Sequence, residues 1–119
     1  MPARVVVVLR EQALANKTAE ALINAGYEAV AMRNSMAALK VLEAARRIEL
    51  LITSAYFPGH QPNGLALARM TRRRRPELKV IFTNGRDTKP YVEKDGVFIP
   101  TPADPLALAG AAKMLLRAA

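Results

Sequence analysis

Short apolar runs alternate with segments of helical period along the chain. Runs rich in Val, Ile, Leu and Phe, bounded by Gly, Pro or Asn, predict β-strands. The first, Val5–Val8, is apolar at four successive positions, which is typical of a strand buried on both faces. We predict strands at residues 4–9, 27–32, 49–54, 79–84 and 96–100.

Between these strands, apolar residues recur every three or four positions, as in amphipathic helices. Gly26 stands at a helix stop, Asn34 or Ser35 at a helix start, and Asp104 followed by Pro105 at another start. Helices are predicted at 12–25, about 35–47 and about 64–75, with a short one around residue 91 and a last one from residue 105. In the second helix the residues expected to face inward are Met36, Leu39, Leu42 and Ala45.

Regular alternation of strand and helix favours right-handed crossovers and a parallel sheet. We therefore predict an α/β, doubly wound, flavodoxin-like domain spanning 1–119, with five strands in the order 2-1-3-4-5. The segment 27–32 alternates in polarity, which favours an edge position.

Composition excludes several kinds of site. The 119 residues include no cysteine and one histidine, His60, so neither a disulfide framework nor a thiolate or histidine metal site is expected. No apolar run reaches the roughly 20 residues that span a bilayer, and the N-terminus does not predict a signal peptide. We expect a cytoplasmic protein with no membrane insertion, no metal and no cofactor.

The formal net charge of +8 favours acidic partners. Its most conspicuous feature is the run Arg72–Arg75, at the end of the predicted third helix. There cations complement the helix dipole, so a solvated helix end is the leading interpretation. A patch for phosphate or an acidic partner is the alternative, although no aromatic residues are interleaved with the arginines.

Four segments carry a resemblance to a known family. They are AEALINAGYEAV (19–30), IELLITSAYFPG (48–59), NGLALARMTRRRRPELKVIFTNG (63–85) and GVFIPTPADPLAL (96–108). In order and spacing they resemble the receiver domains of bacterial two-component response regulators, over nearly the whole chain. The resemblance implies a phosphoryl group transferred from a histidine kinase to an aspartate, with Mg²⁺ held by carboxylates and with a hydroxyl and a lysine that contact the phosphoryl group.

Position by position, this chemistry is missing. The acidic pair falls on Leu9 and Arg10, with only the following Glu11 acidic; the phosphoacceptor falls on Ser54, the switch hydroxyl on Asn84 and the lysine on Thr101. The chain's aspartates, Asp87, Asp95 and Asp104, lie too late to end the first or third strand. A serine cannot form an acyl phosphate, so the resemblance implies a receiver without its phosphorylation residues.

Several of these positions have two interpretations. Arg10 is either a solvated loop arginine or, beside a helix N-terminus, a small-anion site. Thr53 and Ser54 are expected to close the third strand, with modification of Ser54 by a serine kinase as an alternative. Phe98 matches the family's aromatic switch position, and here we expect a fixed rotamer.

Three functions remain open. The first is a phosphorylation-independent interaction module that binds a histidine kinase, a phosphotransfer protein or another receiver, or forms a homodimer. Its expected interface comprises Lys89, Tyr91, Lys94, Asp95 and Arg117. The second, which is not favoured, is a basic nucleic-acid-binding protein on the same scaffold. The third, an enzyme-like phosphoacceptor, is nearly excluded by the missing carboxylates. No attached output domain is expected; the chain is a stand-alone protein or a fragment.

Overall fold

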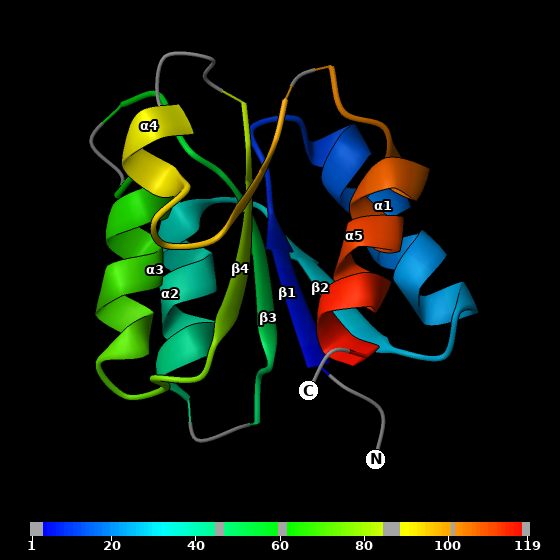
Figure 1. Cartoon of the computed structure of the whole chain (residues 1–119), viewed down its shortest axis with the longest axis horizontal. Coiled ribbons are helices and arrows are strands. Elements are labelled where there is room, and N and C mark those ends of the chain that lie inside the picture. The colour runs from blue at the N-terminus through cyan, green and yellow to red at the C-terminus, as the bar shows by residue number, and fades with distance from the viewer. Residues whose placement is uncertain (1–3, 45–46, 60–61, 85–88, 101, 118–119) are drawn as a thin grey trace.

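In the computed structural model, five strands alternate with five helices within the described residues, which are 4–44, 47–59, 62–84, 89–100 and 102–117 (Figure 1). The strands are β1 (Arg4–Val8), β2 (Glu28–Met32), β3 (Leu50–Ser54), β4 (Lys79–Thr83) and β5 (Val97–Ile99). The helices are α1 (Gln12–Asn24), α2 (Ser35–Glu43), α3 (Gly64–Arg72), α4 (Lys89–Val92) and α5 (Pro105–Arg117). Each predicted element is present, with bounds shifted by a few residues.

The strands form one parallel sheet in the order β2-β1-β3-β4-β5, which confirms the predicted fold class and strand order. Helices α1 and α5 cover one face, and α2, α3 and α4 cover the other (Figure 1). As predicted, the segment 28–32 is an edge strand. Because the strands are parallel, their carboxyl ends all lie along the same side of the sheet.

Two apolar layers hold the helices to the sheet. Val6, Val8, Leu51 and Phe82 pack toward α2 and α3, whereas the alternate positions of the same strands pack toward α1 and α5. Side chains along a strand point to the two faces of the sheet in turn. Both sets are buried because helices cover both faces. The unbroken apolar run of β1 follows from this burial on both faces.

Side-chain caps begin three of the helices. Asn34, Asn63 and Asp104 each accept a hydrogen bond of 2.8 Å from a backbone N–H three residues ahead. These caps confirm the predicted starts at Asn34 and Asp104. At the end of α1, Gly26 has φ +96°, a left-handed conformation that favours glycine, as predicted for a helix stop.

Helix α2 corrects the sequence prediction in one respect. The helix ends at Glu43, and Met36 is 48% exposed instead of facing the core. Ala38 and Leu42 define the inner face, and a residue two positions before Ala38 lies about 200° around the helix axis from it. The predicted inward residue Ala45 lies outside the described part of the chain. Within that part, no helix is long and apolar enough to cross a lipid bilayer.

Candidate functional site

Two of the predicted site residues, Arg10 and Ser54, are in contact at the carboxyl ends of the strands. The backbone N–H of Arg10, just after β1, donates a 3.0 Å hydrogen bond to the Oγ of Ser54 at the end of β3. Ser54 pairs in register with Thr83, and the N–H of Ala55 donates to the Thr83 carbonyl at 2.7 Å. The ends of β1, β3 and β4 are thus tied directly to one another.

Leu9 and Glu11, on either side of Arg10, have different environments. Leu9 is buried in the apolar layer beneath α1 and α5, where it offers no ligand atom. Glu11 is exposed at the N-cap of α1, and its side chain makes no capping hydrogen bond. Among the described residues no group of three or more His, Asp, Glu or Cys side chains is arranged to hold a metal ion. One carboxylate alone is a poor Mg²⁺ site.

Arg10 lies at the surface with its guanidinium above an aromatic ring. The guanidinium carbon is 5.6 Å from the ring centroid of Tyr56, which is itself half exposed. A cation–π contact at an exposed position contributes about 0.5–1 kcal/mol. No ion pair joins Arg10 to a described carboxylate, so its charge is not neutralised locally.

Ser54 is only 2% exposed. Its hydroxyl accepts the Arg10 N–H, and its backbone carbonyl accepts a hydrogen bond from the Thr53 hydroxyl at 2.9 Å. A protein kinase needs an accessible hydroxyl in an extended segment, and Ser54 is neither accessible nor outside the sheet. The geometry therefore argues against the alternative that Ser54 is modified by a serine kinase.

Gly64 explains how the third helix approaches this edge so closely. A Cβ at this position would overlap the backbone carbonyl of Ser54 and crowd the Thr53 side chain. The N–H of Gly64 donates to the Ala55 carbonyl at 3.1 Å, which closes the loop after β3. Gly64 is not in the left-handed region, so its backbone conformation does not require glycine. The lack of space for a Cβ does.

Asn84 follows β4 with φ +70°, a left-handed conformation that asparagine tolerates better than most residues. Its Oδ1 and the Oγ1 of Thr83 are buried, and neither finds a hydrogen-bond partner among the described residues. Thr101, the predicted counterpart of the family's lysine, lies outside the described residues, as does His60. Among the described residues, this end of the sheet therefore combines buried hydroxyl and amide oxygens with the exposed guanidinium of Arg10.

The residues of the predicted interface have different environments. Lys89, Lys94 and Arg117 are exposed, and Phe98 is partly buried against the layer beneath α2 and α3. Asp95 forms ion pairs with Arg69 at 3.4 Å and Arg72 at 3.7 Å. These contacts, which tie the segment after α4 to α3, were not predicted. The side chain of Tyr91 lies outside the described part of the structure.

The side chains of the four arginines at 72–75 fall into two groups, which the sequence did not predict. Arg72 donates from Nε to the Leu78 carbonyl at 3.1 Å, and Arg75 donates to the carbonyls of Leu42 and Ala44 at the end of α2. Arg73 and Arg74 are exposed. No local signal distinguishes the four, because the acceptors belong to other elements.

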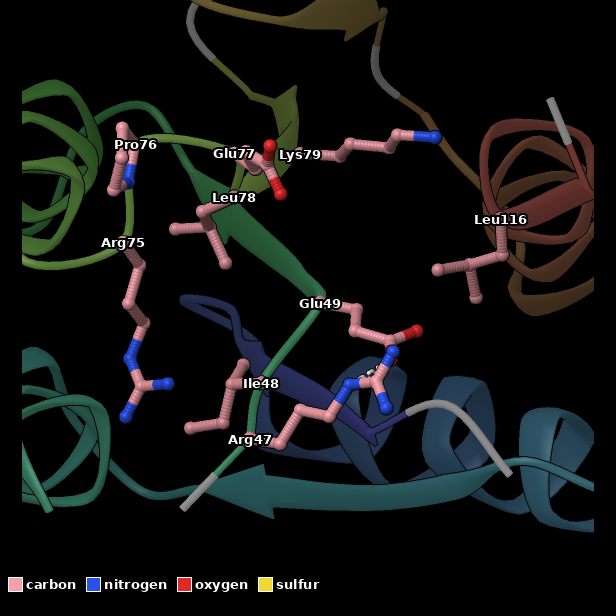
Figure 2. Close-up of a pocket in the computed structure, with 9 residues that line it drawn as sticks. All are labelled: Arg47, Ile48, Glu49, Arg75, Pro76, Glu77, Leu78, Lys79 and Leu116. Carbon is pink, nitrogen blue, oxygen red and sulfur yellow. Dashed lines mark ion pairs between the residues drawn. The ribbon is translucent and has the colours of Figure 1, made fainter. Parts of the chain in front are cut away.

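A hollow of about 590 Å³ lies at the opposite, amino-end edge of the sheet (Figure 2). Its cations already have partners: Arg47 contacts Glu49 at 2.7 Å, Lys79 donates to the Leu115 carbonyl at 2.5 Å, and Arg75 contacts α2. The Lys79 contact joins the start of β4 to α5, and the Arg75 contact joins the segment after α3 to the end of α2. The hollow therefore has a structural explanation and is the weaker candidate for a site.

The chain is similar in structure to receiver domains. It matches a response regulator receiver protein from Sinorhizobium medicae with a TM-score of 0.84 and 21% identity, over 98% of this chain and 96% of that one. It matches a CheY-like receiver domain protein from Methanospirillum hungatei with a TM-score of 0.84 and 20% identity, over 99% and 96%. The receiver domain of the hybrid histidine kinase CckA matches with a TM-score of 0.77 and 29% identity, over 96% and 99%. No protein-family model matches the chain. The chain has the receiver-domain fold.

Proposed function

We propose that this protein is a receiver-like interaction module of two-component signal transduction that acts without being phosphorylated. The observation that carries the proposal is the edge formed by Leu9, Arg10 and Ser54. A buried leucine, an exposed guanidinium and a buried, hydrogen-bonded serine stand where a receiver needs two Mg²⁺ ligands and a phosphoacceptor. On this fold such an edge supports binding and not phosphoryl transfer, so we assign no enzymatic activity.

The partner in this proposal is a cytoplasmic signalling protein, namely a histidine kinase, a phosphotransfer protein or another receiver, including a second copy. Exposed apolar side chains on β5 and α5 support an interface there: Val97 is 40%, Leu106 77% and Met114 75% exposed. Large apolar side chains left in water contribute strongly when a partner covers them. Lys89, Lys94 and Arg117 are exposed, and we propose that their charge selects the partner.

Intact-mass measurement after incubation with a small acyl-phosphate donor and Mg²⁺ tests the proposal. We expect no phosphoryl adduct on the natural protein. We also expect none on Ser54→Asp, because a restored carboxylate still lacks the neighbouring acidic pair at positions 9 and 10. The variant carrying Leu9→Glu, Arg10→Asp and Ser54→Asp together is the matched control for a reconstituted edge. A stoichiometric, base-labile adduct on the natural protein contradicts the proposal.

A second candidate function, nucleic-acid binding, depends on the net charge of +8 and the exposed Arg73 and Arg74. It predicts weak binding with steep salt dependence and no sequence preference. Binding to random-sequence DNA, measured at two salt concentrations, distinguishes it from the first. An affinity that falls steeply as the salt concentration rises, with no sequence preference, would favour this candidate.

A further inference from the structure

The four consecutive arginines have two separate tasks. Arg72 and Arg75 donate from their side chains to backbone carbonyls. The side chains of Arg73 and Arg74 are exposed and form no hydrogen bond or ion pair with the described residues. Hydrogen bonds to carbonyls and the dipoles of the helix ends therefore explain the positions of Arg72 and Arg75. The other two are left for a different explanation.

Arg73 and Arg74 line a groove of about 300 Å³ between the carboxyl ends of α2 and α3, which lie side by side on one face of the sheet (Figure 1). We call it the α2–α3 groove, and its lining residues are Leu42, Glu43, Met70, Thr71, Arg73 and Arg74. Leu42 and Thr71 are buried, and the Thr71 hydroxyl donates to the Leu67 carbonyl, so the deepest part presents little unpaired polar surface.

The walls of the groove combine apolar surface with positive charge. Met70 is 39% exposed, and its flexible thioether adapts to differently shaped apolar side chains. Among the described lining residues, Arg73 and Arg74 are cationic and Glu43 is the acidic one, and no ion pair joins Glu43 to either arginine. The partial negative charge at the end of α2 is already met by Arg75, which donates to the carbonyls of Leu42 and Ala44. The groove therefore has an excess of positive charge.

We propose that the α2–α3 groove binds an acidic peptide segment that inserts an aliphatic side chain between α2 and α3. Arg73 and Arg74 bind its carboxylates, because a guanidinium can donate two parallel hydrogen bonds to one carboxylate. Leu42 and Met70 receive the aliphatic side chain. The groove lies on the opposite face of the sheet from α5 (Figure 1), so this inference goes beyond the proposed function and names a second surface.

A peptide fits this groove better than a nucleic acid does. The lining residues that the structure describes include no aromatic side chain on which a base could stack. Glu43 would repel a phosphate chain that runs across the groove, whereas a peptide can place its carboxylates only beside the arginines. A volume of about 300 Å³ lies at the lower end of the range for ligand pockets and suits one anchoring side chain with its neighbours.

Selection from a display library of random short peptides on the whole protein tests this inference. We expect enrichment of peptides in which Asp or Glu flanks Leu, Ile or Met. Arg73→Glu with Arg74→Glu should weaken binding of the selected peptides about tenfold or more, because the new glutamates repel the acidic residues of the peptide. Arg73→Gln with Arg74→Gln, which removes charge without reversing it, should give a smaller loss.

Lys17→Glu with Lys113→Glu is the matched control, since it makes the same charge change on α1 and α5. This control should bind the peptides nearly as the natural protein does. Circular dichroism and thermal melting verify that each variant is folded. Peptides without acidic residues, equal binding to the Arg73→Glu/Arg74→Glu variant, or tighter binding of random-sequence DNA through the same arginines would each overturn the inference.

Discussion

The backbone N–H of Arg10 donates a 3.0 Å hydrogen bond to the side-chain oxygen of Ser54 and so joins the end of β1 to the end of β3. The two residues are 44 positions apart in the chain. In a phosphorylatable receiver the corresponding strand ends supply carboxylates, which repel one another and need a cation between them. Here a neutral hydrogen bond joins the two strand ends.

Ser54→Ala should destabilise the protein by about 1–2 kcal/mol. The substitution removes the acceptor of the Arg10 N–H and leaves that donor partly buried without a partner. Urea unfolding followed by circular dichroism measures the change. Ser54→Thr, which keeps the hydroxyl, separates loss of the hydrogen bond from a change in packing; equal stability of Ser54→Ala and the natural protein would show that the bond contributes nothing.

Gly64→Ala and Gly110→Ala should have opposite effects. At position 64 the added methyl group overlaps the Ser54 carbonyl, and overpacking of this kind costs about 1–3 kcal/mol. At position 110, inside α5, it meets no atom within 4 Å, and the higher helix propensity of alanine stabilises by up to about 1 kcal/mol. The shift in melting temperature measures both. A stabilised Gly64→Ala would disprove the close approach of α3 to β3.

Arg75→Ala should destabilise by about 1–2 kcal/mol, whereas Arg73→Ala should lie within about 0.5 kcal/mol of the natural protein. The first substitution removes hydrogen bonds to the Leu42 and Ala44 carbonyls, and the second removes an exposed side chain with no partner among the described residues. Chemical denaturation compares the two. Similar effects of both substitutions would contradict the division of the arginine run.

Arg10 should bind phosphate or sulfate weakly, with a dissociation constant of about 1 mM or higher, because its guanidinium is exposed and screened by solvent. The motivation is a cation that precedes α1 in the chain and forms no ion pair with a described carboxylate. Amide chemical shifts of residues 10–14 followed during a phosphate titration detect binding. Arg10→Gln should abolish the shifts; shifts that survive in this variant would place the anion elsewhere.

Leu106→Asp with Met114→Asp should weaken association with a second copy or a signalling partner about tenfold or more, because charged groups then replace the exposed apolar surface of α5. Light scattering measures self-association, and pull-down from the native cell measures partner binding. Tyr91→Ala tests the aromatic position of the predicted interface, and Ile23→Asp on α1, also an exposed apolar residue, is the control. Association lost only with Arg73→Glu and Arg74→Glu would move the interface to the α2–α3 groove.

Most strands and helices could be predicted because apolar runs and helix caps are signals carried by neighbouring residues. The run Val5–Val8 could be assigned to a two-sided strand, and Asn34 and Asp104 to caps, because each signal lies within a few residues of its effect. The prediction that Met36 faces the core was wrong. Helix α2 spans only nine residues, so the spacing of its apolar residues defines the inner face poorly.

At the candidate site, the sequence by itself determined which groups are absent. It placed leucine, arginine and serine at the ends of β1 and β3, which excludes an acyl phosphate at position 54 whatever the packing. Tertiary structure decided how the remaining groups are used. It paired Arg10 with Ser54, placed Tyr56 below the guanidinium, and brought Arg75 to carbonyls more than 30 residues away while leaving Arg73 exposed. Identical neighbouring side chains differ in role because a hydrogen bond depends on where the acceptor lies in space, and chain folding alone sets that distance.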